Sequence, residues 1–215
     1  PLTTPGFSIR PLPEVISEFD YLISLGVKDI AFYDDALLVK NEKTLIPFLA
    51  YAAKKNVNFH TPNALHARFI TPELAHNLVS AGFKTFYLGF ESTSAQWHSK
   101  TGQKITAHEF ETAVKNLIDA GAHRKNISAY IMLGHPADDE QAIEPSIKYA
   151  GQLGVRTMLA EFSPIPGTAD SVFAEKLLDL AEPLNHNKTA WPIVFLGPER
   201  VNRIKQLCHE CNASV

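Results

Sequence analysis

The chain has 215 residues, of which 45% are hydrophobic and 20% are charged, and its formal net charge is −3. No basic stretch follows a helix face, which argues against a generic nucleic-acid-binding surface. No apolar run reaches the roughly 20 residues that a membrane helix needs. The 2 cysteines argue against a disulfide scaffold and for a reducing compartment, so we expect a cytoplasmic protein.

The chain begins with a proline-rich segment, PLTTPGFSIRPLPE, that is typical of a loop. A helix is predicted at about residues 13–25, and no strand precedes it. In a chain of alternating strands and helices, each helix is expected to follow a strand. We therefore expect a first strand and its loop upstream of Pro1, and we interpret the chain as a fragment of a larger protein.

Helix-like stretches repeatedly end in a turn that is followed by an apolar run. Glycine or asparagine stands at these turns, where a helix needs a left-handed residue to end. The residues are Gly26, Asn56, Gly82, Gly121 and Gly154. The apolar runs are continuous rather than alternating, which is typical of strands buried on both faces of a parallel sheet. They predict strands at residues 28–33, 57–60, 84–89, 128–133 and 156–161, each preceded by a helix.

The predicted fold class is therefore α/β with a parallel sheet. A barrel and an open doubly wound sheet both fit the alternation. No Gly-x-Gly-x-x-Gly pattern follows any predicted strand, so a dinucleotide-binding Rossmann fold has little support.

Polar residues follow each predicted strand, at the end where parallel α/β proteins bind their ligands. In chain order they are Tyr33, Asp34 and Asp35; His60, Asn63, His66 and Arg68; Glu91, Ser92 and Thr93; Gly134, His135 and Asp138; and Glu161 and Ser163. Such loops are polar in many proteins without any ligand, and an acidic residue can simply favour a helix N-terminus. Carboxylates nevertheless recur at the same end of several strands, next to glycines that let a ligand approach the backbone. This recurrence favours a binding site.

Two cysteines, Cys208 and Cys211, lie near the C-terminus in the sequence CHEC. Two thiolates do not complete a four-ligand zinc or iron–sulfur site, so no metal site is predicted within this chain. The sequence also lacks the His-Glu-x-x-His, Gly-x-Ser-x-Gly and P-loop motifs.

Four segments together resemble the radical SAM superfamily. They are RPLPEVISEFDYLISLGVKDIAFYDDALL, FHTPNALHARFITPELAHNLVSAGFKTFYLGFEST, AYIMLGHPADDEQ and LAEFSPIPGT. The chain is most similar to the iron–sulfur oxidoreductases that are often joined to a cobalamin-binding domain. The resemblance covers roughly residues 7–170, in the family's order and spacing. It implies a partial (β/α)6 TIM-like barrel that lacks its first strand here, with a core domain at residues 1–170 and a C-terminal helical extension at 171–215.

The resemblance also implies site residues for S-adenosylmethionine (SAM). Glu91 is similar to the family's ribose-binding residue, and Ser92 is expected to add a hydrogen bond. Asp34 or Asp35 stands in the place of the family's Gly-Gly-Glu segment and is expected to accept hydrogen bonds from the SAM amino group. The remaining implied residues are Gly134 and Glu161, which lie in the segments expected to contact the adenine, and the substrate-binding candidates His60, Asn63 and His66.

The sequence departs from the family in two places. Of the Gly-x-Ile-x-Gly-x-x-Glu pattern, Gly134 fits and Met132 takes the isoleucine place, whereas Tyr130 and Ala137 differ. The Cys-x-x-x-Cys-x-x-Cys motif that binds a [4Fe–4S] cluster is absent, and we expect it upstream of Pro1. The resemblance implies that the intact parent reduces SAM with this cluster and releases a 5′-deoxyadenosyl radical. The chain alone is expected to be inactive.

Two other functions stay open. A complete aldolase- or isomerase-like barrel often has a strand-end lysine or a phosphate-binding loop, and no predicted strand ends in lysine. A barrel without a cluster could instead serve as a non-catalytic binding module. The expected partners are a small-molecule or unknown substrate, the upstream part of the same protein and cobalamin in a separate domain; no nucleic acid or membrane is expected.

Overall fold

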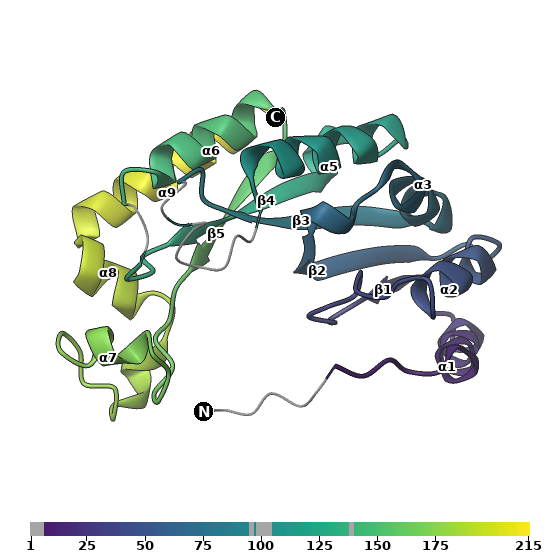
Figure 1. The fold of residues 1–215 in the computed structure, drawn as a ribbon, viewed down its shortest axis with the longest axis horizontal. Coiled ribbons are helices and arrows are strands. Elements are labelled where there is room, and N and C mark those ends of the chain that lie inside the picture. The colour runs from purple at the N-terminus through teal and green to yellow at the C-terminus, as the bar shows by residue number, and fades with distance from the viewer. Residues whose placement is uncertain (1–6, 95–96, 98–104, 138–139) are drawn as a thin grey trace. The chain divides into compact units, whose positions relative to one another are not determined.

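The structure is a computed structural model that describes residues 7–94, 97, 105–137 and 140–215. Helices and strands alternate along the chain (Figure 1). The strands are β1 (Asp29–Ala31), β2 (Asn58–His66), β3 (Phe83–Glu91), β4 (Ile127–Leu133) and β5 (Arg156–Glu161). The helices are α1 (Leu12–Ser24), α2 (Leu45–Ala52), α3 (Pro72–Ala81), α5 (Ala107–Asp119), α6 (Ile143–Gln152), α7 (Ser171–Ala174), α8 (Ala190–Leu196) and α9 (Pro198–Ala213). Short 3-10 helices are η1 (Ala67–Phe69), η2 (Arg124–Asn126) and η3 (Pro183–His186).

The strands form one 5-stranded parallel sheet in the order β1-β2-β3-β4-β5. Each strand follows a helix, so the predicted α/β class and parallel sheet are confirmed. The five predicted strands all have counterparts, with ends that differ by a few residues. β1 lies at an edge of the sheet.

Strand β2 is longer than predicted, because it continues past Pro62 to His66. Its pairing with β3 shifts register twice, the second time between Thr61 and Leu65. A proline cannot donate a hydrogen bond to a neighbouring strand, so an inner strand can contain one only at such an irregularity. As a consequence His60, Asn63 and His66 lie within the strand rather than beyond its end.

The predicted helix ends are confirmed at the four glycines, with φ values of 82° at Gly26, 106° at Gly82, 102° at Gly121 and 69° at Gly154. The expectation for Asn56 is wrong, because the only non-glycine residues with positive φ in the described ranges are Lys40 and Glu91. At Gly82 the backbone also leaves no room, since a Cβ there would lie 2.5 Å from the Val57 carbonyl oxygen.

Contacts within the chain divide it into two compact units. Unit 1 contains the described residues of Phe90–Thr106 and Ala129–Val215, and unit 2 contains those of Gly6–Gly89 and Ala107–Ser128. The helical extension predicted at residues 171–215 is part of unit 1, and its boundary at residue 170 stays a prediction. None of the helices in the described ranges is long and apolar enough to cross a membrane.

Each unit has its own aromatic core. In unit 2, Phe59 packs against Phe19, Phe48 and Phe83 with ring centroids 5.3 to 5.9 Å apart. In unit 1, the fully buried Trp191 stacks on Phe195 at 5.3 Å and belongs to a cluster with Ala174 and Leu180. Helix α9 packs against β5 and α6 in this unit (Figure 1).

Candidate functional site

The last residue of β3, Glu91, has a left-handed backbone with a φ of 67°. The Ser92 N–H donates to the Phe90 carbonyl at 2.9 Å, so Glu91 is the central residue of a three-residue turn. Three-residue turns with positive φ at the centre are rare and strained. Residues held in such conformations cost about 1–3 kcal/mol and occur disproportionately at binding and catalytic sites. The turn redirects the Glu91 side chain as the strand ends.

The loop after Glu91 is tied down by buried hydroxyl groups. Ser92 is 1% exposed, and its Oγ accepts a hydrogen bond from the Ser94 N–H at 3.1 Å. The Thr93 N–H donates to Oγ of Ser146 on α6 at 2.8 Å. The Ser146 hydroxyl in turn donates to the Ala142 carbonyl at 2.6 Å. These bonds hold the strained turn in place. In them the Ser92 oxygen accepts a hydrogen bond from a residue of the same loop.

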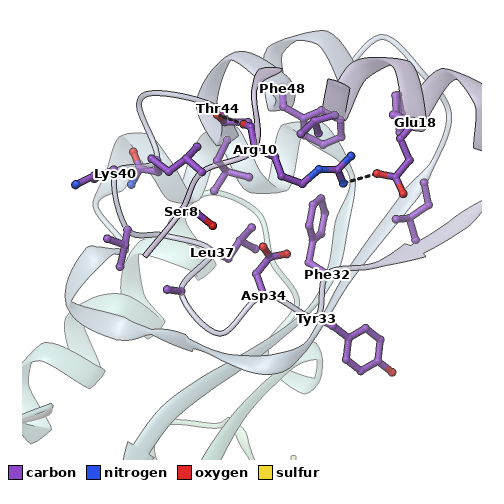
Figure 2. Close-up of a pocket in the computed structure, with 18 of the residues that line it drawn as sticks. Ser8, Arg10, Glu18, Phe32, Tyr33, Asp34, Leu37, Lys40, Thr44 and Phe48 are labelled. Atoms are coloured by element: carbon purple, nitrogen blue, oxygen red, sulfur yellow. Dashed lines mark hydrogen bonds and ion pairs between the residues drawn. The ribbon is translucent and has the colours of Figure 1, made fainter. Parts of the chain in front are cut away.

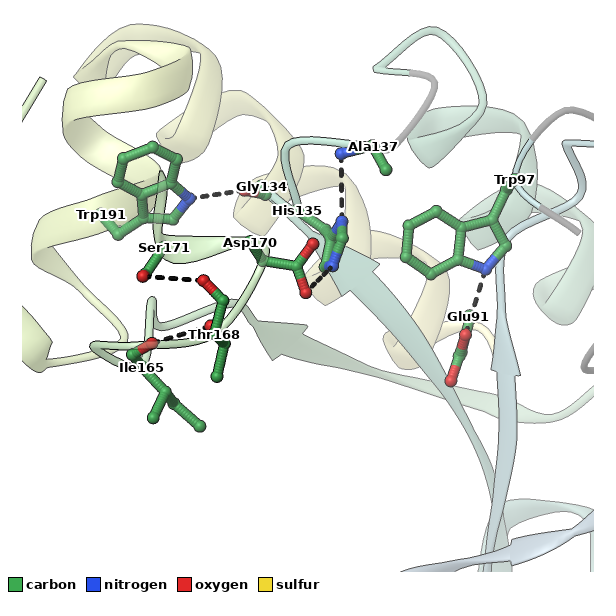
Figure 3. A network of polar contacts seen from close by, with 10 residues as sticks. All are labelled: Glu91, Trp97, Gly134, His135, Ala137, Ile165, Thr168, Asp170, Ser171 and Trp191. Atoms are coloured by element: carbon green, nitrogen blue, oxygen red, sulfur yellow. Dashed lines mark hydrogen bonds and ion pairs between the residues drawn. The ribbon is translucent and has the colours of Figure 1, made fainter. Parts of the chain in front are cut away.

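The same loop positions a tryptophan beside Glu91. Oγ of Ser94 accepts a hydrogen bond from the Trp97 N–H at 3.3 Å, which is the pattern of a helix N-cap. Trp97 is helical and only 1% exposed. Its indole Nε1–H donates to Oε2 of Glu91 at 3.1 Å (Figure 3). The Glu91 carboxylate is therefore oriented by a buried donor.

His135, just after β4, lies against the other side of this tryptophan. The two rings form an edge-to-face contact at 4.9 Å, and His135 makes a similar contact with Phe162 at 4.6 Å. The His135 Nδ1 accepts from the Ala137 N–H at 3.1 Å, so a neutral ring carries its proton on Nε2. That nitrogen lies 3.5 Å from Oδ2 of Asp170 (Figure 3). Glu91, Trp97, His135 and Asp170 thus form a continuous series of contacts within unit 1.

Gly134 is packed under helix α8. Its carbonyl accepts a hydrogen bond from Nε1 of Trp191 at 2.6 Å (Figure 3). A Cβ on Gly134 would lie 3.5 Å from Pro192. The neighbouring Leu133 carbonyl accepts from the Phe162 N–H at 2.9 Å. These backbone groups therefore have partners within the protein. The role predicted for Gly134 toward adenine stays a prediction.

Glu161, at the end of β5, forms an ion pair with Lys205 of α9, with 2.5 Å between Oε1 and Nζ. The Glu161 side chain is 11% exposed. This pair accounts for a carboxylate at the strand end without any ligand, and it joins β5 to the C-terminal helix. The cofactor-binding role predicted for Glu161 stays a prediction.

In unit 2, Asp34 lines a pocket of about 480 Å³ between α1, β1 and the segment that leads to α2. Figure 2 shows Asp34 next to Leu37 in the pocket wall, whereas the exposed Tyr33 points away. Asp35 has a partner on strand β2, since its Oδ1 accepts a hydrogen bond from Nδ2 of Asn63 at 3.1 Å. Asn63 also donates to the Tyr33 carbonyl at 2.8 Å, so it fixes the loop after β1.

His60 bridges three strands of unit 2. Its Nε2 lies 3.2 Å from Oδ1 of Asp29 on β1, and its Nδ1 lies 3.2 Å from Oγ1 of Thr85 on β3. Hydrogen bonds from Asn58 and then His60 lower the pKa of the Asp29 carboxyl. His66 is exposed and its ring lies 5.0 Å from that of Phe69. The substrate-binding roles of His60, Asn63 and His66 stay predictions, and all three side chains make contacts within the protein.

The two cysteines lie on α9. Cys208 is buried, and its thiol donates to the Thr157 carbonyl with a sulfur–oxygen distance of 3.4 Å. Burial raises the pKa of this thiol, and the neighbouring Cys211 adds to the effect. Within the described ranges, no group of three or more His, Cys, Asp or Glu residues could hold a metal ion. The cysteines that the structure describes therefore do not fit a [4Fe–4S] cluster.

The sequence reasoning found Glu91 but missed Trp97. The only signal was the Ser94-x-x-Trp97 spacing, which is compatible with a helix N-cap but does not show which carboxylate the indole meets. His135 was noted at a strand end without a role. The structure places both side chains in the same series of contacts as Glu91.

Comparison with solved structures shows what this fold is similar to. The radical S-adenosylmethionine methyltransferase TsrM from Kitasatospora setae, with cobalamin and a [4Fe–4S] cluster bound, matches 80% of this chain with a TM-score of 0.66 and 16% identity. TsrM with tryptophan substrate and the SAM analogue aza-SAM matches with a TM-score of 0.65. Coproporphyrinogen III oxidase (HemN) from Escherichia coli, a radical SAM enzyme, matches 94% of this chain with a TM-score of 0.51 and 12% identity.

The match is partial for each of these proteins, because the chain covers 35% of TsrM and 48% of HemN. No family model and no curated protein sequence matches the chain. At these identities the likeness shows the fold, which is the partial (β/α) barrel of radical SAM enzymes. The fold that the sequence segments implied is thus confirmed.

Proposed function

We propose that this chain is the core domain of a radical SAM enzyme, in which SAM is cleaved reductively at a [4Fe–4S] cluster to start radical chemistry on a substrate. The shared fold supports this proposal, since two structural neighbours are TsrM with a SAM analogue and HemN, a radical SAM enzyme. The quoted sequence segments support it independently, because they occur in the order of that family.

The observation that carries the proposal is the turn at Glu91. The carboxylate stands at the carboxyl end of a buried strand, on a left-handed residue that is held by four neighbouring hydrogen bonds. A carboxylate accepts two hydrogen bonds side by side, which suits the two hydroxyl groups of a ribose. In the proposed function Glu91 binds the ribose of SAM. The hydrogen bond expected from Ser92 to the ligand stays a prediction; in the structure its oxygen accepts a bond within the loop.

The cluster requires a separate assignment. The described residues offer no suitable group of ligands, and Cys208 is buried against β5. The proposal therefore assigns the cluster ligands to a part of the parent protein that this sequence does not include. TsrM binds cobalamin as well as a cluster, so a cobalamin-binding domain in the parent is part of the same proposal. A small-molecule substrate and a cytoplasmic location complete it.

The runner-up function is a binding module that has the barrel but no cluster. The poor fit of the described residues to a cluster is the observation that favours it. Both functions allow SAM to bind at Glu91. They differ in whether the full-length parent, isolated anaerobically, contains a [4Fe–4S] cluster that reacts with SAM.

Binding at Glu91 can be tested in the full-length parent by titrating SAM in a calorimeter. Glu91→Ala should raise the dissociation constant roughly tenfold to a hundredfold, because a hydrogen bond to a charged group is worth about 1.5–3 kcal/mol. Glu144→Ala is the matched control, since this carboxylate pairs with Arg203 at 2.9 Å on the surface of α6. An unchanged SAM affinity in Glu91→Ala, together with a melting temperature several degrees lower, would show that the carboxylate only supports the fold.

A further inference from the structure

We infer that Trp97 is a positioning residue for the carboxylate of Glu91, and that a ribose diol binds tightly only when the indole N–H fixes that carboxylate. The inference rests on the proposed function, because it assumes that Glu91 accepts hydrogen bonds from the ligand. It adds a residue that the sequence analysis did not identify.

The geometry leaves Trp97 little freedom. Its side chain is 1% exposed, and its backbone N–H is bound by Oγ of Ser94 at 3.3 Å. The indole has a single donor and no acceptor, so its bond to Oε2 of Glu91 has only one direction. The ring is also held from its other side by His135, at 4.9 Å and an interplanar angle of 84°.

His135 is itself fixed by neighbours on three sides. It accepts from the Ala137 N–H, its Nε2 faces Asp170, and its ring contacts Phe162. The orientation of the Trp97 ring is therefore imposed by the loop after β4 and by the segment before α7. Figure 3 shows His135 between Trp97 on one side and Asp170 on the other.

A fixed carboxylate matters for this kind of ligand. A glutamate side chain has several rotatable bonds, and a flexible carboxylate must lose that freedom when it binds two adjacent hydroxyl groups. A donor that holds one oxygen in advance removes part of that cost and sets the plane of the carboxylate. The left-handed backbone of Glu91 also helps to fix the carboxylate, because it sets the direction in which the side chain leaves the strand.

A purely structural role would also place this indole N–H near an acceptor, because buried polar groups are almost always hydrogen-bonded. The two roles differ in how Trp97 and Glu91 depend on one another. If Trp97 acts through Glu91, its N–H should contribute to affinity only while the carboxylate is present. If it only stabilises the fold, its effect on affinity should be the same with or without that carboxylate.

A double-mutant cycle in the full-length parent measures this dependence. The probe is S-adenosylhomocysteine, titrated in a calorimeter, and the variants are Trp97→Phe, Glu91→Gln and the double variant. Trp97→Phe keeps the aromatic ring and removes the N–H. We expect Trp97→Phe to raise the dissociation constant roughly five- to tenfold when Glu91 is present. We expect almost no effect of the same substitution when position 91 is already glutamine.

Tyr51→Phe provides the matched control. The Tyr51 hydroxyl donates to the carboxylate of Asp20 at 2.7 Å in unit 2, so this variant also removes one hydrogen bond from an aromatic side chain to a carboxylate. The affinity for S-adenosylhomocysteine should not change in Tyr51→Phe. A second probe, the 2′-deoxyribose counterpart of S-adenosylhomocysteine, lacks one hydroxyl group of the diol. The preference for the ribose form should decrease in Trp97→Phe and remain in Tyr51→Phe.

The outcomes separate this inference from the proposed function. In one outcome the unmutated parent prefers the ribose form, Glu91→Gln abolishes this preference, and Trp97→Phe leaves it unchanged. The role inferred for Trp97 is then wrong, and the proposed function stands. If the parent shows no preference and Glu91→Gln binds normally, both are wrong. An equal effect of Trp97→Phe in both backgrounds also overturns the inference.

Should Trp97→Phe fail to fold, the parent labelled with 5-fluorotryptophan gives the answer without a change at position 97. One ¹⁹F signal should shift in Glu91→Gln and again when S-adenosylhomocysteine is added. The signal that disappears in Trp191→Phe should not shift in Glu91→Gln, because Trp191 bonds Gly134 and not Glu91. If no signal responds to both the Glu91 change and the ligand, Trp97 does not report on the site and the inference is overturned.

Discussion

The side-chain amide of Asn212 pairs with both backbone groups of Thr157 on the edge strand β5. Its Oδ1 accepts from the Thr157 N–H at 2.7 Å, and its Nδ2 donates to the Thr157 carbonyl at 2.8 Å. An asparagine on α9 thus supplies the hydrogen bonds that a further strand would otherwise make. Edge strands with unpaired backbone groups are prone to aggregate, and this contact protects one of them.

Replacing Asn212 should destabilise unit 1 without affecting any proposed ligand. Thr157 is 2% exposed, so its N–H would be left buried and unpaired, and its carbonyl would keep only the weaker bond from the Cys208 thiol. We expect Asn212→Ala to lower the free energy of unfolding by about 1–3 kcal/mol in a urea titration. Asn212→Asp should lose at least as much, because a carboxylate cannot donate to the Thr157 carbonyl.

Gln206→Ala is the control on the same helix, since the Gln206 side chain donates a hydrogen bond to the exposed Glu210 at 2.8 Å. Its effect should stay within about 0.5 kcal/mol. Equal stabilities of Asn212→Ala and Gln206→Ala would show that water satisfies Thr157 just as well.

The ion pair between Glu161 and Lys205 leads to a prediction that distinguishes Glu161 from Glu91. Glu161→Gln should lower the stability by about 1–3 kcal/mol, because it removes the negative charge that pairs with Lys205 and weakens the remaining hydrogen bond. It should leave the affinity of the parent for S-adenosylhomocysteine unchanged. Thermal unfolding and calorimetric titration of the same preparation measure both quantities.

Lys205→Met serves as the matched variant, because it removes the other partner of the same pair. The stability losses of Glu161→Gln and Lys205→Met should not add in the double variant. A loss of affinity in Glu161→Gln but not in Lys205→Met would mean that Glu161 contacts the ligand after all.

The parallel α/β fold could be predicted because its signals are local. Buried parallel strands such as residues 84–89 and 128–133 are continuous apolar runs, and the helices before them end at glycines with positive φ. The extension of β2 past Pro62 could not be predicted in this way. A proline inside a run argues against an inner strand, and only the pairing with β3 shows that the register shifts around it.

The candidate site could be predicted only in part. Glu91 could be identified from the sequence because it is a carboxylate at the end of a buried strand. Its positive φ could not be predicted, because it depends on the hydrogen bonds that close the turn. Glu161 had the same local pattern, but its partner Lys205 is far away in the sequence. Local sequence therefore did not separate a carboxylate held by an indole from one held by a lysine.

The two glycines that end α1 and α3 should differ in their tolerance of alanine. Both have positive φ, so either substitution strains the backbone by about 1 kcal/mol. At Gly26 a Cβ would meet no atom within 4 Å, whereas at Gly82 it would lie 2.5 Å from the Val57 carbonyl oxygen. Gly82→Ala should therefore cost about 3 kcal/mol or more in urea unfolding. Equal losses for Gly26→Ala and Gly82→Ala would show that the start of β2 can move away.

The last prediction concerns metal binding by the 215-residue chain itself. Reconstituted anaerobically with iron and sulfide, it should not acquire a stoichiometric [4Fe–4S] cluster, because a cluster needs more thiolates than Cys208 and Cys211 provide. The raised pKa of the Cys208 thiol adds to this, since iron binds the thiolate and burial disfavours that form. For the same reason, alkylation at mildly alkaline pH should modify the half-buried Cys211 first and Cys208 only after unfolding. Absorbance and iron content measure the cluster, and Cys208→Ala is the control. A cluster signal near one per chain that disappears in Cys208→Ala would show that α9 binds iron, and the assignment of the ligands to another part of the parent would then be wrong.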